Sequence, residues 1–308
     1  MASRPMMLDE QVAHNKRRTA MLFVVVFLIV VLLVMAVGFV FLGNILVTGV
    51  LALVIGLVYL GIASSSGTSA ILKSARARPA NPNVREEKLL LYKVEELCIA
   101  AQLPMPKVYV QEDDDINAFA TGKDPEHGIV CVTTTALREL DQEELEGVLA
   151  HELAHIKNYD IRVTLYAIAL IGLIAMLAEI VFRSLFFGGG RRGGGKEGGA
   201  AMLVIFLVAI VFMVLAPILS KMVYFAISRK REFLADATGA HLSRNPDGLA
   251  RALEKIGARQ PRPHHGDKTV ASLYFDNPFR KLGRRERGSL FSSHPPIEER
   301  VRRLRGQG

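Results

Sequence analysis

Cysteine and tryptophan are the scarcest residues of this chain, which has 308 residues but only two cysteines and no tryptophan. Cys98 and Cys131 are not spaced as a metal-binding pair, so they do not predict a thiolate metal site. They fit small apolar residues in a reducing compartment. The acidic run 113–115 is not followed by the Gly and Glu of an EF-hand, so it indicates a solvated turn rather than a calcium site.

Nucleic-acid recognition patterns are missing from the Pro- and Arg-rich stretch 259–287. Its basic residues are not interleaved with aromatic side chains and form no recognition-helix pattern, which argues against a nucleic-acid partner. Contact with the anionic headgroups of a lipid bilayer is the interpretation that suits a membrane-tethered domain. The basic residues in question are Lys281, Arg284, Arg285 and Arg287.

Charge is absent from two long runs near the N-terminus. Residues 20–42 would form a helix about 34 Å long, which is enough to cross a bilayer. Residues 45–63 form a second run of about 28 Å, and only Gly43-Asn44 separates the two. A cleaved signal peptide is the alternative, since Lys16-Arg17-Arg18 precede the first run, but the run is too long for the apolar region of a signal peptide and no small-residue cleavage site follows it. We therefore expect a transmembrane hairpin over residues 20–63, preceded by a cytoplasmic segment, residues 1–19.

Two more apolar runs lie within residues 161–227. Val163–Phe187 carries a single charged pair, Glu179 and Arg183 at i,i+4 spacing, and Ala200–Ser220 carries no charge at all. These runs predict transmembrane helices three and four. The Gly-rich loop 188–199 would join them.

Basic residues that flank the four predicted spans indicate the topology. Four spans leave both termini and both soluble portions on one side, which the positive-inside rule makes cytoplasmic. The loop 188–199 disagrees, because it carries Arg191, Arg192 and Lys196 yet would lie outside; a re-entrant third and fourth segment would remove the conflict. We expect a multi-pass protein of the plasma (inner) membrane. The cytoplasmic flanks hold Lys16, Arg17, Arg18, Lys73, Arg76, Arg78, Arg229, Lys230 and Arg231.

The most informative motif is His151-Glu152-Leu153-Ala154-His155. Two histidines four residues apart share one face of a helix, so both imidazoles can bind one metal ion. Glu152 lies about 100° around that helix, close enough to reach a water on the metal without binding the metal itself. A capping box of Asp141 with Glu144, and apolar residues at helical spacing, predict the helix independently. The alternative is a surface helix that happens to carry two histidines.

A catalytic zinc site needs a third protein ligand and leaves its fourth position to water. Glu232 is the best candidate for that ligand. Asp236 lies one helical turn further along the same face, where it can accept the spare N–H of a ligand histidine. The alternative is a solvated acidic pair beside basic neighbours.

Four segments occur in the order seen in one protease family. They are Asn117–Gly122, His151–His155, Glu232–Asp236 and Ser293–Pro296. In these segments the chain resembles the HtpX-type membrane zinc metalloproteases, which are relatives of the CAAX prenyl proteases. The resemblance runs from Asp9 to the C-terminal helix and so covers nearly the whole chain.

This resemblance implies a gluzincin fold with one Zn²⁺ per chain, held by His151, His155 and Glu232. It also implies that Asp236 orients a ligand from behind. Arg300, on the final helix, could pair with Asp236.

The resemblance also implies how substrate is held. The strand with Asn117, Ala118 and Phe119 would form an exposed sheet edge beside the zinc cleft, where an extended substrate backbone can pair with it. The alternative is a strand that merely closes the sheet. His294 would donate a hydrogen bond to the oxyanion, or it is only a helix-start histidine positioned by the prolines that follow it.

Two soluble portions, residues 64–160 and 228–308, remain outside the spans. The first holds 10 Lys/Arg against 17 Asp/Glu and the second 18 against 9, so their charges of −7 and +9 favour docking of one on the other. Each is near or below the size at which a single core is comfortable. We expect a mainly α membrane protein with four transmembrane helices and a discontinuous cytoplasmic α+β zincin-like protease domain.

Local patterns predict the elements of that domain. Val84–Ala101 is an amphipathic helix, and Val108–Val110 and Ile129–Val132 are strands. A helix opens at Asn245-Pro246, and a final helix covers Pro296–Leu304.

Together these features predict a membrane-anchored zinc endopeptidase. It would hydrolyse misfolded or damaged membrane proteins, or other unfolded polypeptides, at the cytoplasmic face, as part of protein quality control. Glu152 would take the proton of the attacking water and give it to the leaving amine. The sequence does not predict the oligomeric state.

Three other functions are weaker. An intramembrane metalloprotease would not place so many acidic residues just before the motif. A CAAX-type prenyl protease normally has more than four spans. A non-catalytic, metal-stabilised membrane scaffold would not need Glu152 beside an open metal position.

Overall fold

The computed structural model describes residues 43–187, 229–259 and 295–306, together with short pieces between residues 17 and 39 and between residues 206 and 218. The chain divides into two compact units. The first unit holds residues 1–64 and 166–226, and the second holds residues 65–165 and 227–308. Each unit is therefore discontinuous in sequence.

Two helices in the described part of the chain are long and apolar enough to span a membrane. They are α2 (Ile45–Ser74) and the portion of α6 (Asp160–Phe187) that ends at Leu177. A shorter apolar helical piece covers Phe23–Leu32, inside the first predicted span. The Gly-rich loop and most of the fourth predicted span lie outside the described residues, so four spans stay a prediction.

The first unit is a packing of apolar helices. The Tyr59 hydroxyl of α2 donates a hydrogen bond to the Ala169 carbonyl of α6 at 3.1 Å. Gly56 of α2 faces Phe27 so closely that an added Cβ would lie 2.8 Å from its ring. Large apolar side chains elsewhere on α2, such as Leu46 and Val50, are exposed, which is the pattern of a lipid-facing surface.

Helix α2 is longer than its charge-free run. We expected the run to end at residue 63, but the helix continues to Ser74. The serines and glycine of residues 64–67 do not break it, because Ile71 and Leu72 beyond them are buried in the second unit. It ends where Arg76 adopts a left-handed backbone, with φ of 51°.

The second unit contains a four-stranded sheet with the order β1-β2-β4-β3. Strands β2 (Lys107–Gln111) and β4 (Ile129–Thr133) are parallel and confirm the two predicted strands. Strands β1 (Arg78–Pro79) and β3 (Ala118–Thr121) are antiparallel edges. The acidic run after β2 forms the expected turn, in which the Asp113 side chain accepts from the Asp115 N–H.

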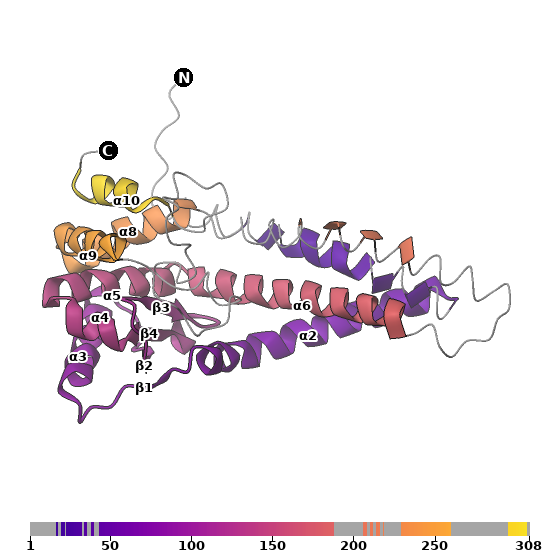
Figure 1. Ribbon diagram of the computed structural model, residues 1–308, viewed down its shortest axis with the longest axis horizontal. Helices are drawn as coiled ribbons and strands as arrows, with labels where there is room; N and C mark the ends of the chain where they lie inside the picture. The colour runs from indigo at the N-terminus through magenta and orange to yellow at the C-terminus, as the bar shows by residue number, and fades with distance from the viewer. Residues whose placement is uncertain are drawn as a thin grey trace, which may run out of the picture. The chain divides into compact units, whose positions relative to one another are not determined.

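Helix α5 (Gln142–Lys157) is the centre of the second unit (Figure 1). It packs against β3 and β4 and against α3 (Arg85–Ala101), which confirms the predicted amphipathic helix. It also contacts α8 (Arg229–Ser243) and α9 (Pro246–Ala258). The predicted Asn245 cap of α9 is confirmed by a 3.0 Å bond from the Gly248 N–H. A short helix, α4 (Thr134–Glu139), leads into α5.

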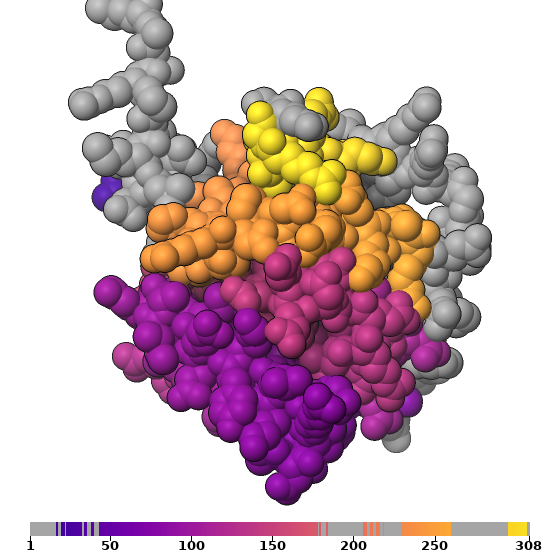
Figure 2. Space-filling model, turned by 90° about the vertical axis from the view of Figure 1, so that its left-hand side faces the viewer, coloured from indigo at the N-terminus to yellow at the C-terminus, as the bar shows by residue number. Residues whose placement is uncertain are grey.

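Glycines let these helices approach α5 closely. A Cβ on Gly239 of α8 would lie 2.8 Å from the His151 backbone nitrogen, and one on Gly147 of α5 would lie 2.6 Å from the Leu249 nitrogen. Helix α10 (Ile297–Leu304) lies on α8 and α9, as Figure 2 shows. The second unit thus stacks α10, the α8–α9 pair and α5 in that order.

Candidate metal centre

The motif helix begins with the predicted capping box. The Asp141 side chain accepts from the Glu143 and Glu144 backbone N–H groups at 2.9 and 2.8 Å, and the Glu144 carboxylate accepts from the Asp141 N–H at 2.9 Å. The cap fixes where α5 starts, and hence which face of the helix carries His151 and His155.

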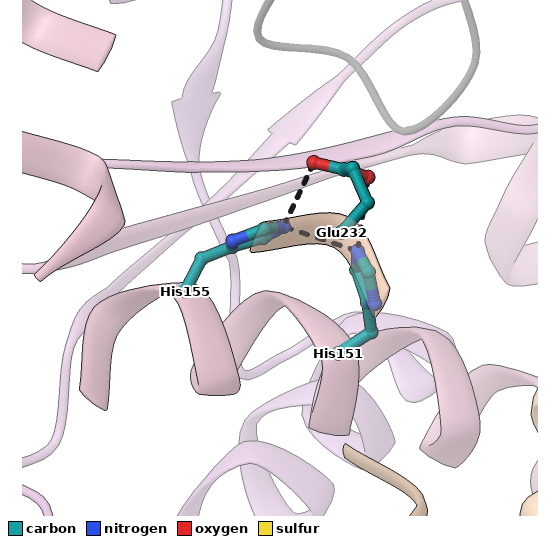
Figure 3. A group of neighbouring side chains, drawn as sticks. All are labelled: His151, His155 and Glu232. Atoms are coloured by element: carbon teal, nitrogen blue, oxygen red, sulfur yellow. Dashed lines mark hydrogen bonds and ion pairs between the residues drawn. The ribbon is translucent and has the colours of Figure 1, made fainter. Parts of the chain in front are cut away.

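His151 and His155 meet Glu232 of α8 at a single point (Figure 3). Their Nε2 atoms are 3.1 Å apart, and the Glu232 oxygens lie 3.9 Å from the first and 3.6 Å from the second. A tetrahedral zinc ion with bonds of about 2.0–2.2 Å separates its ligand atoms by about 3.3–3.6 Å. The three side chains are therefore spaced as the ligands of one metal ion.

The far nitrogens of both imidazoles face carboxylates. His151 Nδ1 lies 3.0 Å from Asp236 Oδ1, and His155 Nδ1 lies 3.1 Å from Asp160 Oδ2. An ionised carboxylate accepts a hydrogen bond but cannot donate one, so each Nδ1 carries a proton, and in the neutral imidazole that binds a metal Nε2 presents a lone pair. Two ring nitrogens 3.1 Å apart can share one metal ion, or one proton when no metal is bound. The donor set thus fits a metal.

Buried charge points to the same conclusion. Four carboxylates and two guanidinium groups are buried around the histidines, which leaves an excess of two negative charges when both histidines are neutral, as metal ligands are. Buried charges are normally paired or bound to a metal. One divalent cation would balance this excess. The carboxylates belong to Glu152, Asp160, Glu232 and Asp236, and the guanidinium groups to Arg231 and Arg300.

An arginine stands behind each histidine–aspartate pair. Arg300 of α10 donates to both oxygens of Asp236, at 2.7 and 2.9 Å, and so completes the His151 triplet, His151–Asp236–Arg300. Arg231 of α8 donates to Asp160 Oδ1 at 2.8 Å and completes the His155 triplet, His155–Asp160–Arg231. The pair of Arg300 with Asp236 that the sequence suggested is present.

The two histidines respond to these surroundings in opposite directions. Burial disfavours the charged His151, and the nearby His155 and Arg300 add to this, so its pKa falls to about 4 despite Asp236. Burial also disfavours the charged His155, but Asp160, Glu232 and Glu152 outweigh it and raise its pKa to about 9.

Asp236, the acid behind His151, differs from an ordinary carboxylate. Burial alone would raise the pKa of Asp236, but the charge of Arg300 lowers it to about 2. Glu152 is buried on α5 beside His151, and its charge reinforces burial in raising the pKa of the Cys131 thiol. Cys131 is therefore a packed, unreactive thiol, as its sequence context suggested.

Asp160 and Arg231 were not recognised from the sequence. Asp160 comes five residues after His155 and opens α6, so it looked like a linker residue before an apolar run. Between the two helices Tyr159 adopts a left-handed backbone, with φ of 61°, and the Asp160 carboxylate lies beside His155. A non-glycine residue in that region costs about 1–2 kcal/mol, and no local sequence pattern announces it.

Strand β3 is an edge strand of the sheet and packs against α5. We expected this edge to be exposed, but it is buried. Asn117, Ala118 and Phe119 are all buried, because α5 packs on the strand. Thr133 N–H donates to the Asn117 carbonyl, so in the alternating antiparallel pattern Ala118 and Ala120 direct their backbone groups away from β4. The Asn117 side chain accepts from the Ala118 N–H at 3.1 Å.

His294 lies outside the described residues, which resume at Pro295. Its suggested part in catalysis stays a prediction.

Comparison with known proteins assigns this arrangement to a group. The model of peptidase family M48 matches residues 85–307. The "Protease HtpX homolog" of Streptococcus agalactiae serotype III is 41% identical over 299 residues, which cover 97% of this chain and 99% of that protein. The "Protease HtpX homolog" of Listeria monocytogenes serotype 4a is 41% identical over 304 residues, with the same coverage of both.

A solved structure shares the fold. The crystal structure of S. mikatae Ste24p matches with a TM-score of 0.50 and 19% sequence identity. The match covers 82% of this chain and 57% of that one, so this chain spans little more than half of the length of Ste24p.

Proposed function

This chain belongs to peptidase family M48 and is a membrane-associated metalloprotease, and we propose that it is a zinc endopeptidase that cleaves misfolded or damaged membrane proteins at the cytoplasmic face of the plasma membrane. The observation that carries the zinc assignment is the convergence of His151, His155 and Glu232, backed by two buried carboxylates. One ion per chain fits this donor set, with the fourth position left to water.

Glu152 is the proton carrier of the proposed mechanism. A zinc ion held by the three ligands would polarise the scissile carbonyl and lower the pKa of the attacking water. Glu152, buried next to His151 but outside the ligand set, accepts the proton of that water and returns it to the leaving amine. His294 is retained as the proposed donor to the oxyanion.

The proposed substrate is an extended polypeptide. The strand is buried in this structure, but the backbone groups of Ala118 and Ala120 are directed away from β4, so an extended segment could add to this edge through main-chain hydrogen bonds once the covering atoms move aside. A substrate carbonyl would take the Ala118 N–H from the Asn117 side chain. Main-chain pairing needs an unfolded segment and reads little sequence, which suits a protease for misfolded proteins.

Glu152→Gln tests this proposal. The variant should bind zinc as the parent does but cleave an unfolded casein-like substrate about 10²- to 10⁴-fold more slowly, because the proton carrier is gone. Glu143→Gln is the matched control, since Glu143 lies on the same helix but is exposed and pairs only with surface groups. A zinc-loaded Glu152→Gln protein with parental activity would contradict the mechanism and favour a metal-stabilised scaffold.

The proposed orientation can be tested in intact cells. With Cys98 and Cys131 replaced, an impermeant maleimide should label a cysteine introduced at Gly194 and should not label one introduced at Asp124. Protection at both positions would indicate re-entrant third and fourth segments. Labelling at 124 alone would overturn the cytoplasmic active site.

A further inference from the structure

Asp160 connects the start of a helix to the proposed metal ligand His155. It is the first residue of α6, and it is buried. One carboxylate oxygen lies 3.1 Å from His155 Nδ1, and the other accepts from Arg231 at 2.8 Å. Each carboxylate oxygen of Asp160 therefore has its own partner, His155 for one and Arg231 for the other.

The backbone around Asp160 is arranged to hold that position. Helix α5 ends at Lys157, and the left-handed residue Tyr159 turns the chain directly into α6. The Asp160 carbonyl accepts from the Thr164 hydroxyl at 3.1 Å. A left-handed backbone at a non-glycine residue persists only where the surroundings fix it, and such residues gather at functional sites.

Arg231 reaches Asp160 from a second part of the sequence. It immediately precedes Glu232 at the start of α8, so two adjacent residues serve the same centre. Glu232 faces the histidines, and Arg231 faces the acid behind His155. A shift of α8 would therefore move a ligand and the support of another ligand together.

From these contacts we infer that Asp160 and Arg231 are positioning residues that orient His155 towards the metal. The inference rests on the proposed zinc site. Asp160 keeps the N–H of His155 on Nδ1, which leaves Nε2 to face the metal, and Arg231 fixes the direction of the Asp160 carboxylate. Partners of this kind typically change metal affinity by about 10- to 100-fold when they are removed.

The decisive measurement is the zinc affinity of the full-length protein in detergent, by competition with a chelator. Asp160→Asn should weaken zinc binding by about 10- to 100-fold, and Arg231→Met by a smaller factor. Because Arg231 acts through Asp160, the double variant should bind zinc no more weakly than Asp160→Asn alone. Parental affinity in Asp160→Asn, or losses that simply multiply in the double variant, would overturn the inference.

The chain offers a matched control. Asp124 and His127 form another aspartate–histidine contact, with Nδ1 2.6 Å from Oδ1; this contact is exposed, and neither residue belongs to the ligand group. Asp124→Asn should leave zinc affinity unchanged. If Asp124→Asn weakened zinc binding as much as Asp160→Asn, the loss would not depend on contact with a metal ligand, and the inference would be wrong.

Cobalt gives a readout that a merely structural role would not change. In the Co²⁺-substituted protein, Asp160→Asn should shift the visible ligand-field bands, because the His155 ring is no longer held. Arg231→Lys keeps the charge and is a second variant should Asp160→Asn fail to fold; it should weaken zinc binding a few-fold. Parental affinity in Arg231→Lys together with an unshifted cobalt spectrum would contradict the inference.

The inference can fail separately from the proposed function. If the parent protein binds zinc and loses it in His155→Ala, but Asp160→Asn behaves as the parent, only the inference is wrong. If His155→Ala leaves zinc binding unchanged in the parent background, the proposed zinc site itself is wrong.

Discussion

The His151 triplet and the His155 triplet have the same chemistry but are held in different ways. In the His151 triplet the histidine side chain is 1% exposed, and Arg300 binds both oxygens of Asp236. In the His155 triplet the histidine is 15% exposed, and Arg231 binds only one oxygen of Asp160. The first joins α5, α8 and α10 through buried side chains. The second joins α8 to the first residue of α6.

Replacing the arginine of each triplet should give the largest difference in stability between the two triplets. Arg300→Met leaves the buried Asp236 without its cation, so we expect a loss of about 3–5 kcal/mol in the free energy of unfolding of the zinc-free protein. Arg231→Met should cost less, because Asp160 is more exposed and has lost only one hydrogen bond. Urea titrations of both variants make the comparison. Equal losses in the free energy of unfolding would show that the difference in exposure between the two triplets does not affect stability.

The pH dependence of the zinc-free protein should have two limbs, one for each histidine. His151 has a pKa lowered to about 4, so its contribution is present above pH 6.5 and is lost as the pH falls towards 4. His155 has a pKa raised to about 9, so its contribution is present below pH 6.5 and is lost as the pH rises towards 9. Each limb amounts to at most about 3 kcal/mol.

Thermal unfolding between pH 4 and pH 9, with chelator present, measures both limbs. His151→Asn should flatten the acid limb, and His155→Asn should flatten the alkaline limb. If His155→Asn removed the acid limb instead, the assignment of the two environments would be reversed.

A smaller effect should follow from the helix contact behind His151. Gly239→Ala places a methyl group 2.8 Å from the His151 backbone nitrogen, so α8 must move away from α5 at a cost of about 1–3 kcal/mol. Gly61→Ala is the control, since a Cβ there meets no atom within 4 Å. Melting temperatures of the two variants give the answer. A stable Gly239→Ala protein would show that the packing of α5 on α8 adapts freely.

Local signals were sufficient for much of the second unit. The capping box at Asp141, the helix spacing of His151 and His155, and the strand patterns of β2 and β4 depend on neighbouring residues, and the structure confirms these elements. The same holds for the Asn245 cap of α9. Such features are decided within a few residues, so the sequence is enough to predict them.

What the sequence could not predict depends on distant contacts. Arg231 and Asp160 are 71 positions apart, and they meet because α8 packs on α5 next to the start of α6. The extension of α2 to Ser74 follows from the burial of Ile71 and Leu72, which no local pattern encodes. The burial of β3 likewise results from the packing of α5 on the strand, where an exposed edge was expected.

The sequence separation of Arg300 and His151, 149 positions, also orders events during synthesis. A nascent chain that has produced His151, His155 and Asp160 still lacks Glu232, Asp236 and Arg300, and the rest of α6 lies between the two sets. The ligand set of the metal centre cannot be complete until that apolar helix has left the ribosome. A protease assembled in this order cannot attack its neighbours while it is only half made.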